Sequence, residues 1–192
     1  MLELTELLRE SVEQDFRGFQ MHYQPIFDID SRLVGAEALI RWHCDAYSAV
    51  GPDEFIPLLE QSGLILPVGR WIFEEELTTC ARWEKWLPDF RMSINLSFVQ
   101  LEDEVFCDFL QNILHKTAVD PRNVILELTE SYLAANMVQV MEQLDKIRKS
   151  GIRIAMDDFG TGYSSLGLLK TAPIDIAKID RTFVKGIQSS PF

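Results

Sequence analysis

Polar side chains interrupt several short apolar segments of this sequence, each in or directly after residues that otherwise suit a buried strand. Burying such groups is costly unless they find partners. The residues concerned are Glu37, Asn95, Glu127, Asp157, Asp158, Lys178 and Asp180. Because the feature recurs in five separate segments, we interpret it as one shared site.

The donor atoms of this set are almost all oxygens. Two Glu, two Asp and one Asn amide are candidates, with no His or Cys among them. Such hard donors suit Mg²⁺, Mn²⁺ or Ca²⁺ and not structural zinc. There are enough carboxylates for two divalent ions, and two ions bridged by water are suited to in-line cleavage of a phosphodiester.

Each residue taken alone has a simpler interpretation. A single Glu37 or Asn95 in a strand is more often a hydrogen-bonding group satisfied by its neighbours. The pair Asp157 and Asp158 could cap the following helix. Lys178 could be a surface lysine with a buried stem. A lyase that uses Lys178 as a Schiff base is a further hypothesis, which ranks low because acidic neighbours would keep the amine protonated.

Alternating patterns predict an α/β fold. The expected strands are 22–29, 33–42, 91–97, 124–128, 152–156 and 174–179, and the expected helices begin near residue 4, at 52, after 67, and at 102, 132 and 163. Short strands that are apolar on both faces and separated by helices indicate a parallel sheet covered by helices. No G-x-G-x-x-G or P-loop follows a strand, so nucleotide-binding open sheets lose support.

A barrel is the preferred architecture, since the ends of its strands converge on one face where sites are built. A closed barrel has eight strands and about 250 residues, whereas this chain of 192 residues offers six expected strands. We therefore expect a barrel without its last two strand and helix units. An open apolar edge would favour a homodimer, strand exchange or poor solubility.

The charge balance limits the ligands. With 30 acidic and 18 basic residues the formal charge is −12, so we expect no nucleic-acid polymer as a partner, and an anionic substrate needs metal ions or a few arginines. Cys44, Cys80 and Cys107 have no metal-site spacing and are expected to be reduced, as in the cytoplasm. No signal peptide or membrane-length apolar run is present, although a parent protein could be anchored elsewhere.

Residues 158–160 read Asp-Phe-Gly, as in kinases, but the other kinase motifs are missing and that hypothesis is rejected. The loop 160–166 that follows is rich in glycine and could close over a substrate or supply backbone amides to it.

Several ordered motifs together resemble the EAL family of cyclic di-GMP phosphodiesterases. They are Tyr23-Gln24-Pro25-Ile26, Gly35-Ala36-Glu37-Ala38-Leu39-Ile40-Arg41-Trp42, Ile94-Asn95-Leu96-Ser97, Leu126-Glu127-Leu128-Thr129-Glu130-Ser131, residues 157–166 and Ala177-Lys178-Ile179-Asp180. The resemblance implies a TIM-like (β/α) barrel whose first strand is antiparallel. It divides the chain into a lead-in helix over 1–18 and the domain proper over 19–192.

The resemblance also implies roles at the metal centre. Glu37, Asn95, Glu127 and Asp157 would hold metal, and Asp158 would bind or bridge a second ion. Lys178 would orient or deprotonate the attacking water, and Glu37 and Asp157 complete the catalytic set. The reaction would be hydrolysis of cyclic di-GMP to linear pGpG, supported by Mg²⁺ or Mn²⁺ and inhibited by Ca²⁺.

The substrate would be held by other matching positions. Arg41 would contact a phosphate, with Gln24, Leu39 and Asp180 also on the substrate side. Glu130 would steady the glycine loop.

The family has a further catalytic glutamate and a late glutamine on its last two strands, and neither has a counterpart here. The expectation is weak or no hydrolysis by this stretch alone. The alternative is a non-catalytic receptor for cyclic di-GMP or a protein-interaction module. An upstream sensor or GGDEF-type module is the expected neighbour in a parent protein.

Overall fold

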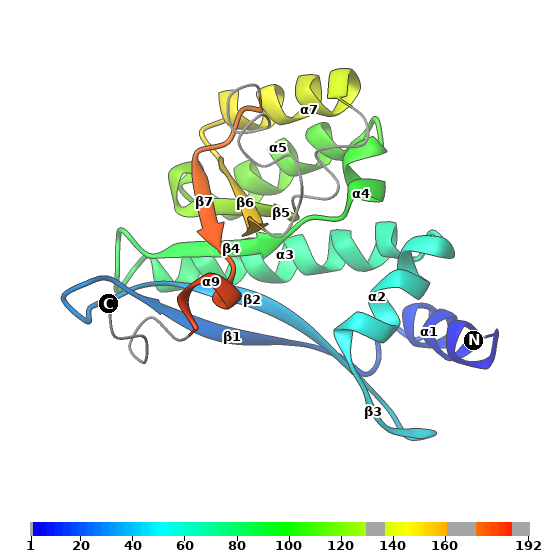
Figure 1. Ribbon diagram of the computed structural model, residues 1–192. Coiled ribbons are helices and arrows are strands. Elements are labelled where there is room, and N and C mark those ends of the chain that lie inside the picture. Colours follow the sequence, from blue (N-terminus) through cyan, green and yellow to red (C-terminus); the bar gives the residue numbers. More distant parts are fainter. Residues whose placement is uncertain (1, 130–136, 161–171, 186–192) are drawn as a thin grey trace.

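The computed structural model describes residues 2–129, 137–160 and 172–185 and is built around one curved sheet (Figure 1). Its strands lie in the order β1-β2-β4-β5-β6-β7, and β3 pairs antiparallel with the carboxyl end of β2. Their bounds are β1 Phe19–Phe27, β2 Leu33–Cys44, β3 Tyr47–Val50, β4 Arg91–Asn95, β5 Val124–Thr129, β6 Arg153–Phe159 and β7 Ile176–Ile179.

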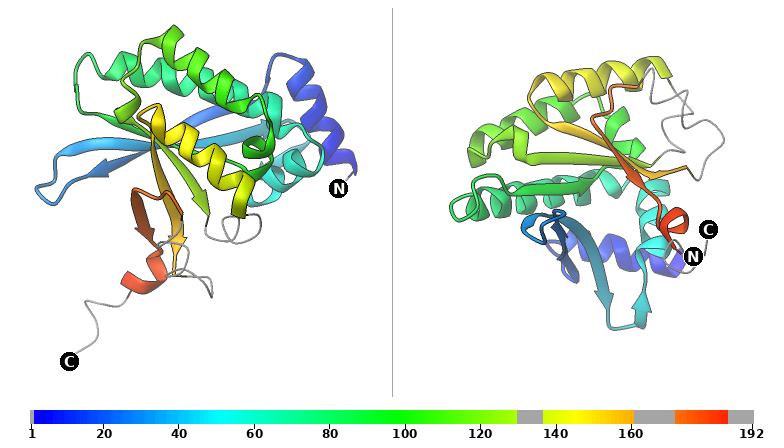
Figure 2. Two further views of the ribbon diagram at one scale, coloured as in Figure 1. Left: turned by 90° about the horizontal axis from the view of Figure 1, so that it is seen from above. Right: turned by 60° about the vertical axis from the view of Figure 1, so that its left-hand side comes forward.

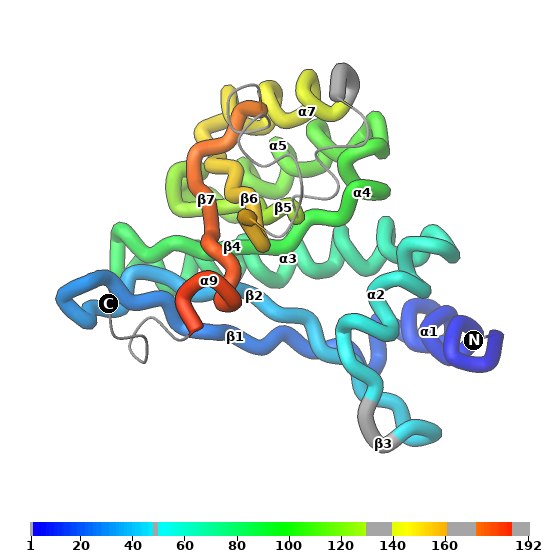
Figure 3. Tube along the Cα trace, viewed as in Figure 1, coloured from blue at the N-terminus to red at the C-terminus, as the bar shows by residue number. Residues whose placement is uncertain are grey.

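The strand directions agree with the expected barrel. β1 pairs antiparallel with β2, and from β2 through β4, β5, β6 and β7 every pairing is parallel. The twist of parallel strands curves the sheet into an arc, which is clear when the chain is followed as a tube (Figure 3). In the described residues, β1 and β7 stand at the two ends of this arc.

Helices surround the arc. They are α1 Leu2–Glu13, α2 Pro52–Gln61, α3 Ile65–Trp83, α4 Phe98–Glu102, α5 Phe106–Thr117, α7 Met137–Lys149 and α9 Arg181–Val184, with a 3₁₀ turn η1 at Pro121–Asn123. Two further views show α3, α5 and α7 running along one face of the sheet (Figure 2). This is the layered packing that buries one face of each strand.

Strand register decides which side chains face away from those helices. Met92, Ile94, Leu126 and Ile154 are fully or almost fully buried in the core. The alternate positions point to the concave side, because successive strand residues face opposite ways. Asn95 lies beside Glu127, and Glu127 beside Ala155.

The same pleat brings the expected site residues to that concave side. Glu37 pairs with Ser93, two residues before Asn95, and Asp157 lies two residues after Ala155. Ile176 pairs with Ala155 and precedes Lys178 by two residues. Side chains from β2, β4, β5, β6 and β7 therefore share one face, toward the carboxyl ends of the parallel strands.

The expected elements were correct in kind and wrong in several bounds. The strand β3 was not predicted, so the described sheet has seven strands instead of six. The helix expected from residue 102 begins at Phe106 as α5, and the short helix α4 before it was not predicted. Ser97 caps α4 in a capping box with Gln100, and Asp103 then takes an extended conformation that ends it. The helix expected after residue 67 begins earlier, at Ile65.

Other expectations fall partly outside the described residues. The helix expected from residue 132 is seen over α7, and the helix expected over 163–170 lies outside the described part. The lead-in helix is present as α1, with Leu4 and Leu8 buried against the core. The three cysteines are free thiols. Among the described helices, none is long and apolar enough to cross a membrane.

Candidate functional site

The centre of the site is a lysine ammonium held by carboxylates from three strands. Lys178 Nζ lies 3.0 Å from Glu37 Oε2 and 3.3 Å from Asp157 Oδ1. It also donates a short hydrogen bond to Glu127 Oε2. Glu37 and Lys178 are 141 positions apart in the chain, so only the sheet brings them together.

Burial differs among the three carboxylates. The side chain of Glu127 is 1% exposed, whereas those of Glu37 and Asp157 are 19% and 24% exposed. Burial raises the pKa of Glu127, and the charge of Lys178 opposes that rise. Burial alone would lower the pKa of Lys178, but the carboxylates of Glu127 and Glu37 outweigh it, and the pKa is raised. The lysine is therefore a firmly protonated cation in this arrangement.

The carboxylates are close enough to share a metal ion. One oxygen each of Glu37, Glu127 and Asp157 lies within 4.8 Å of the others. Two oxygens bound to the same ion at about 2.1 Å can be at most about 4.2 Å apart, so a small side-chain adjustment suffices. The ammonium already stands where a cation is favoured, which supports this fit. Asn95 Nδ2 donates to Glu37 Oε1 at 3.2 Å, leaving its amide oxygen as a further donor atom.

Asp158 is set beside this cluster by an irregular piece of backbone. The pairing of β6 with β7 shifts register between Met156 and Phe159, and Asp158 has a φ of 54°. An Asp tolerates this left-handed conformation better than most residues, and a bulge of this kind redirects side chains. Burial and then the charges of Asp157 and Asp180 raise the pKa of Asp158, and the charge of Lys178 partly opposes that rise.

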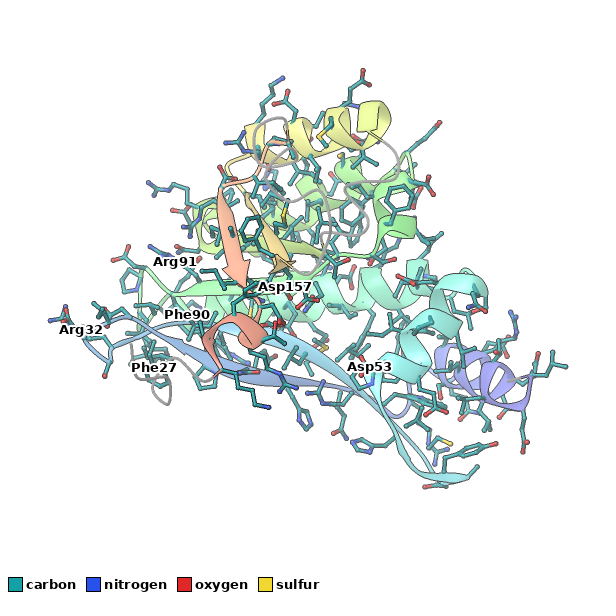
Figure 4. The ribbon with its side chains drawn as sticks, viewed as in Figure 1. Phe27, Arg32, Asp53, Phe90, Arg91 and Asp157 are labelled. Atoms are coloured by element: carbon teal, nitrogen blue, oxygen red, sulfur yellow. The ribbon has the colours of Figure 1, made fainter. Side chains whose placement is uncertain are left out.

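A cavity of about 510 Å³ opens next to the carboxylates. Glu37, Asn95, Asp157 and Asp158 line it on one side. The opposite wall comes from α2 and includes Asp53, and Figure 4 shows how Asp53 and Asp157 come from these separate elements. A space of this size beside clustered carboxylates suits a small-molecule substrate.

The expected substrate residues take different positions. Leu39 and Arg41 line the cavity from β2, and Arg41 Nη1 donates to the carbonyl oxygen of Ile40 at 2.8 Å. Gln24 is exposed on β1 directly across from Glu37. All three residues therefore lie within or beside the opening, with Arg41 the cation among them.

Asp180 has a structural partner in this geometry. Its side chain accepts a hydrogen bond from the backbone N–H of Thr182 at 2.8 Å and caps α9. Thr182 holds the pKa of Asp180 below its usual range. Glu130 and loop residues 161–166 lie outside the described part of the chain.

One pair in the cavity wall was missed by sequence reasoning. Ser97 Oγ donates to Glu60 Oε1 at 2.6 Å, joining the end of β4 to α2, and both residues line the cavity. Ser97 lies in a quoted motif, but nothing in the sequence around Glu60 distinguishes it from an ordinary helix surface residue.

This chain is similar to known proteins in both sequence and fold. A family model described as the EAL domain matches residues 6–191. The cyclic di-GMP phosphodiesterase PdeR of Escherichia coli is 34% identical over 190 residues, covering 99% of this chain and 28% of PdeR.

MucR of Pseudomonas aeruginosa, a bifunctional diguanylate cyclase and cyclic di-GMP phosphodiesterase, is 35% identical over 188 residues, covering 95% of this chain and 27% of MucR.

A solved structure of the P. aeruginosa MucR phosphodiesterase in complex with c-di-GMP matches the fold. Its TM-score is 0.88 at 33% sequence identity, and the match covers 98% of this chain and 76% of that chain. The fold is therefore the expected TIM-like (β/α) barrel with an antiparallel first strand. The chain spans about a quarter of the length of the curated relatives named above.

Proposed function

Because this chain belongs to the EAL domain family, we propose that it hydrolyses cyclic di-GMP to linear pGpG with the support of Mg²⁺ or Mn²⁺. The observation that carries the proposal is the gathering of Glu37, Glu127 and Asp157 from three strands around one cation position. The choice of substrate is supported by the relatives, since PdeR is named a cyclic di-GMP phosphodiesterase and the MucR structure is a c-di-GMP complex. For this chain alone we expect weak or no hydrolysis, and full activity is proposed for a longer parent protein.

The oxygen-rich cluster would hold the metal. Glu37, Asn95, Glu127 and Asp157 supply the donor atoms, and Asp158 would serve a second ion. When bound, the ions would polarise the phosphate and make water more acidic. Ca²⁺ would inhibit, because it prefers longer bonds and more ligands than Mg²⁺.

Lys178 would hold the attacking water. Its ammonium is surrounded by carboxylates and is placed to donate hydrogen bonds, which suits orienting the water better than accepting its proton. Glu37 and Asp157 share contacts with this lysine. Together with Lys178 they would form the catalytic set that acts while water adds to phosphorus.

The substrate would lie in the adjoining cavity. Arg41 would contact a phosphate, and Gln24 and Leu39 would border the nucleotide. Asp180 would act near the second ion, and Glu130 would steady the loop after β6. In the reaction one water adds to phosphorus, the bond from phosphorus to the 3′ oxygen breaks, and that oxygen leaves with a proton. The product is linear and carries a 5′ phosphate.

Activity and metal dependence can be measured together. Cyclic di-GMP is incubated with the purified chain in Mg²⁺, Mn²⁺, Ca²⁺ or EDTA, and pGpG is followed by chromatography. Turnover with Mg²⁺ or Mn²⁺, lost in EDTA and in Glu127→Gln, supports the proposal. Glu102→Gln, an exposed glutamate on α4, is the matched control.

A contrary result is equally clear. Tight binding of cyclic di-GMP in EDTA, with no turnover under any metal condition, would favour the receptor alternative. Calorimetry with and without metal measures that binding.

The wider setting is also a proposal. We propose a domain over 19–192 with residues 1–18 as a lead-in, a cytoplasmic location, and a sensor or GGDEF-type module in a longer parent protein. A homodimer through the open sheet edge is part of the same proposal. Sedimentation of the purified chain tests it, and a monomer across the concentration range would contradict it.

A further inference from the structure

The amino ends of the parallel strands carry a second polar cavity, of about 550 Å³. Three arginines, Arg91, Arg122 and Arg153, line it, together with Asp89 and Asp120. Arg91 begins β4 and Arg153 begins β6. Figure 4 shows Arg91 at the end of β4 away from Asp157. In a chain of formal charge −12, such a gathering of cations is unusual.

The nearby acids are mostly engaged. Asp120 is bound by Arg122, whose Nη2 lies 2.6 Å from Oδ2 and whose Nε lies 3.1 Å from Oδ1. On the neighbouring side, Asp175 is bound by Arg148 at 2.6 Å. Asp89 remains as the other acid in the wall. The charges of Arg122 and Arg148 are therefore matched within the protein.

Arg91 and Arg153 are not matched in this way. Arg153 Nη2 donates to the carbonyl oxygen of Arg122 at 2.9 Å, while its buried Nε has no hydrogen-bond partner among the described residues. Within the same described ranges, Arg91 forms no side-chain hydrogen bond or ion pair. Burial, and then the charge of Arg91, lower the pKa of Arg153, and the charge of Asp175, already bound by Arg148, only partly opposes this. A buried donor without a partner is unfavourable, so a ligand that accepts a hydrogen bond from it would be favourable.

We propose that this cavity binds a phosphate-class oxyanion through Arg91 and Arg153. Guanidinium groups match the oxygens of phosphate in paired hydrogen bonds. The cavity is separate from the carboxylate site, since Arg91 and Asn95 are four residues apart on one strand, roughly 13 Å. The proposal goes beyond the hydrolysis of cyclic di-GMP and does not depend on it.

Inorganic phosphate is the probe. It is titrated into the ¹⁵N-labelled chain in EDTA at constant ionic strength, and the arginine Nε–H signals are followed by NMR. The expected result is a saturable shift of the Arg91 and Arg153 signals, weakened at least tenfold in Arg91→Gln. Arg153→Gln is a second variant, and Arg32→Gln, an exposed arginine in the turn before β2, is the matched control.

AMP, titrated in parallel, distinguishes an esterified phosphate from a free one, and binding of either supports the site. Shifts that are linear and equal in wild type and both variants would overturn it. The proposal would also be overturned if the same shifts appeared on raising the protein concentration without phosphate, because the occupant of the cavity would then be another copy of the chain. Since EDTA removes metal and no turnover is measured, failure here leaves the proposed hydrolysis untouched.

Discussion

The two ends of the parallel strands differ in charge. At the carboxyl ends, carboxylates of Glu37, Glu127 and Asp157 surround one lysine. At the amino ends, Arg91 and Arg153 border a cavity with few free acids. The same strands thus present an acidic end and an arginine-bearing end, and the difference follows from which residues begin and finish each strand.

The largest expected effect is at the buried ligand. Glu127→Gln removes one charge from the carboxylate cluster while keeping the shape of the side chain. Because loss of a residue that only supports a ligand costs about 10–100-fold in metal affinity, loss of the ligand itself should exceed about 100-fold. Mn²⁺ titration by calorimetry measures it, and an unchanged affinity would contradict the assignment of the acidic end.

Glu76 on α3 is a reference carboxylate outside both ends. It is fully buried, its Oε1 accepts from the Tyr23 hydroxyl at 3.0 Å, and its Oε2 has no partner among the described residues. Burial raises its pKa from 4.5 to about 7. Unlike Glu127, it is not paired with any lysine in the described part of the chain.

The sign of the pH effect follows from that shift. The folded state binds the proton of Glu76 more tightly than the unfolded state does, so protonation of Glu76 favours folding. This contribution to stability is complete below about pH 4.5 and is lost as the pH rises through 7. Glu76→Gln should therefore raise the free energy of unfolding at pH 8 by about 3 kcal/mol and change little at pH 4.5. Urea unfolding of both proteins measures the difference, and equal stability at pH 8 would contradict it.

Lys178→Met separates the roles of lysine and metal. The ammonium and a metal ion compete for the same oxygens, so removing the lysine should raise Mn²⁺ affinity at least tenfold while hydrolysis falls. Calorimetry and the pGpG assay give the two values. A parallel loss of both would mean that the lysine supports the fold of the site instead of competing for it.

Asn95→Ala should have the smallest effect. It removes a hydrogen bond to Glu37 and one amide oxygen. Because the carboxylates remain, the expected loss of Mn²⁺ affinity is about tenfold. No change in affinity would restrict Asn95 to a structural contact.

The sequence predicted the alternation of strands and helices because apolar periodicity follows from burial. It did not predict β3, since four residues beginning at Tyr47 leave little pattern. The concave grouping of Glu37, Glu127 and Lys178 was expected from their places in strands. Their ion pairs were not, because the distance between residues 141 positions apart depends on register. The bulge at Asp158 likewise has no sequence signal of its own.

The most direct test of the acidic end is anomalous diffraction from crystals grown with Mn²⁺. The account predicts a peak about 2.1 Å from oxygens of Glu37, Glu127 and Asp157, with Lys178 displaced from at least one of them. Saturating Mn²⁺ with no peak at this position, and with the lysine still bound to all three carboxylates, would contradict the account.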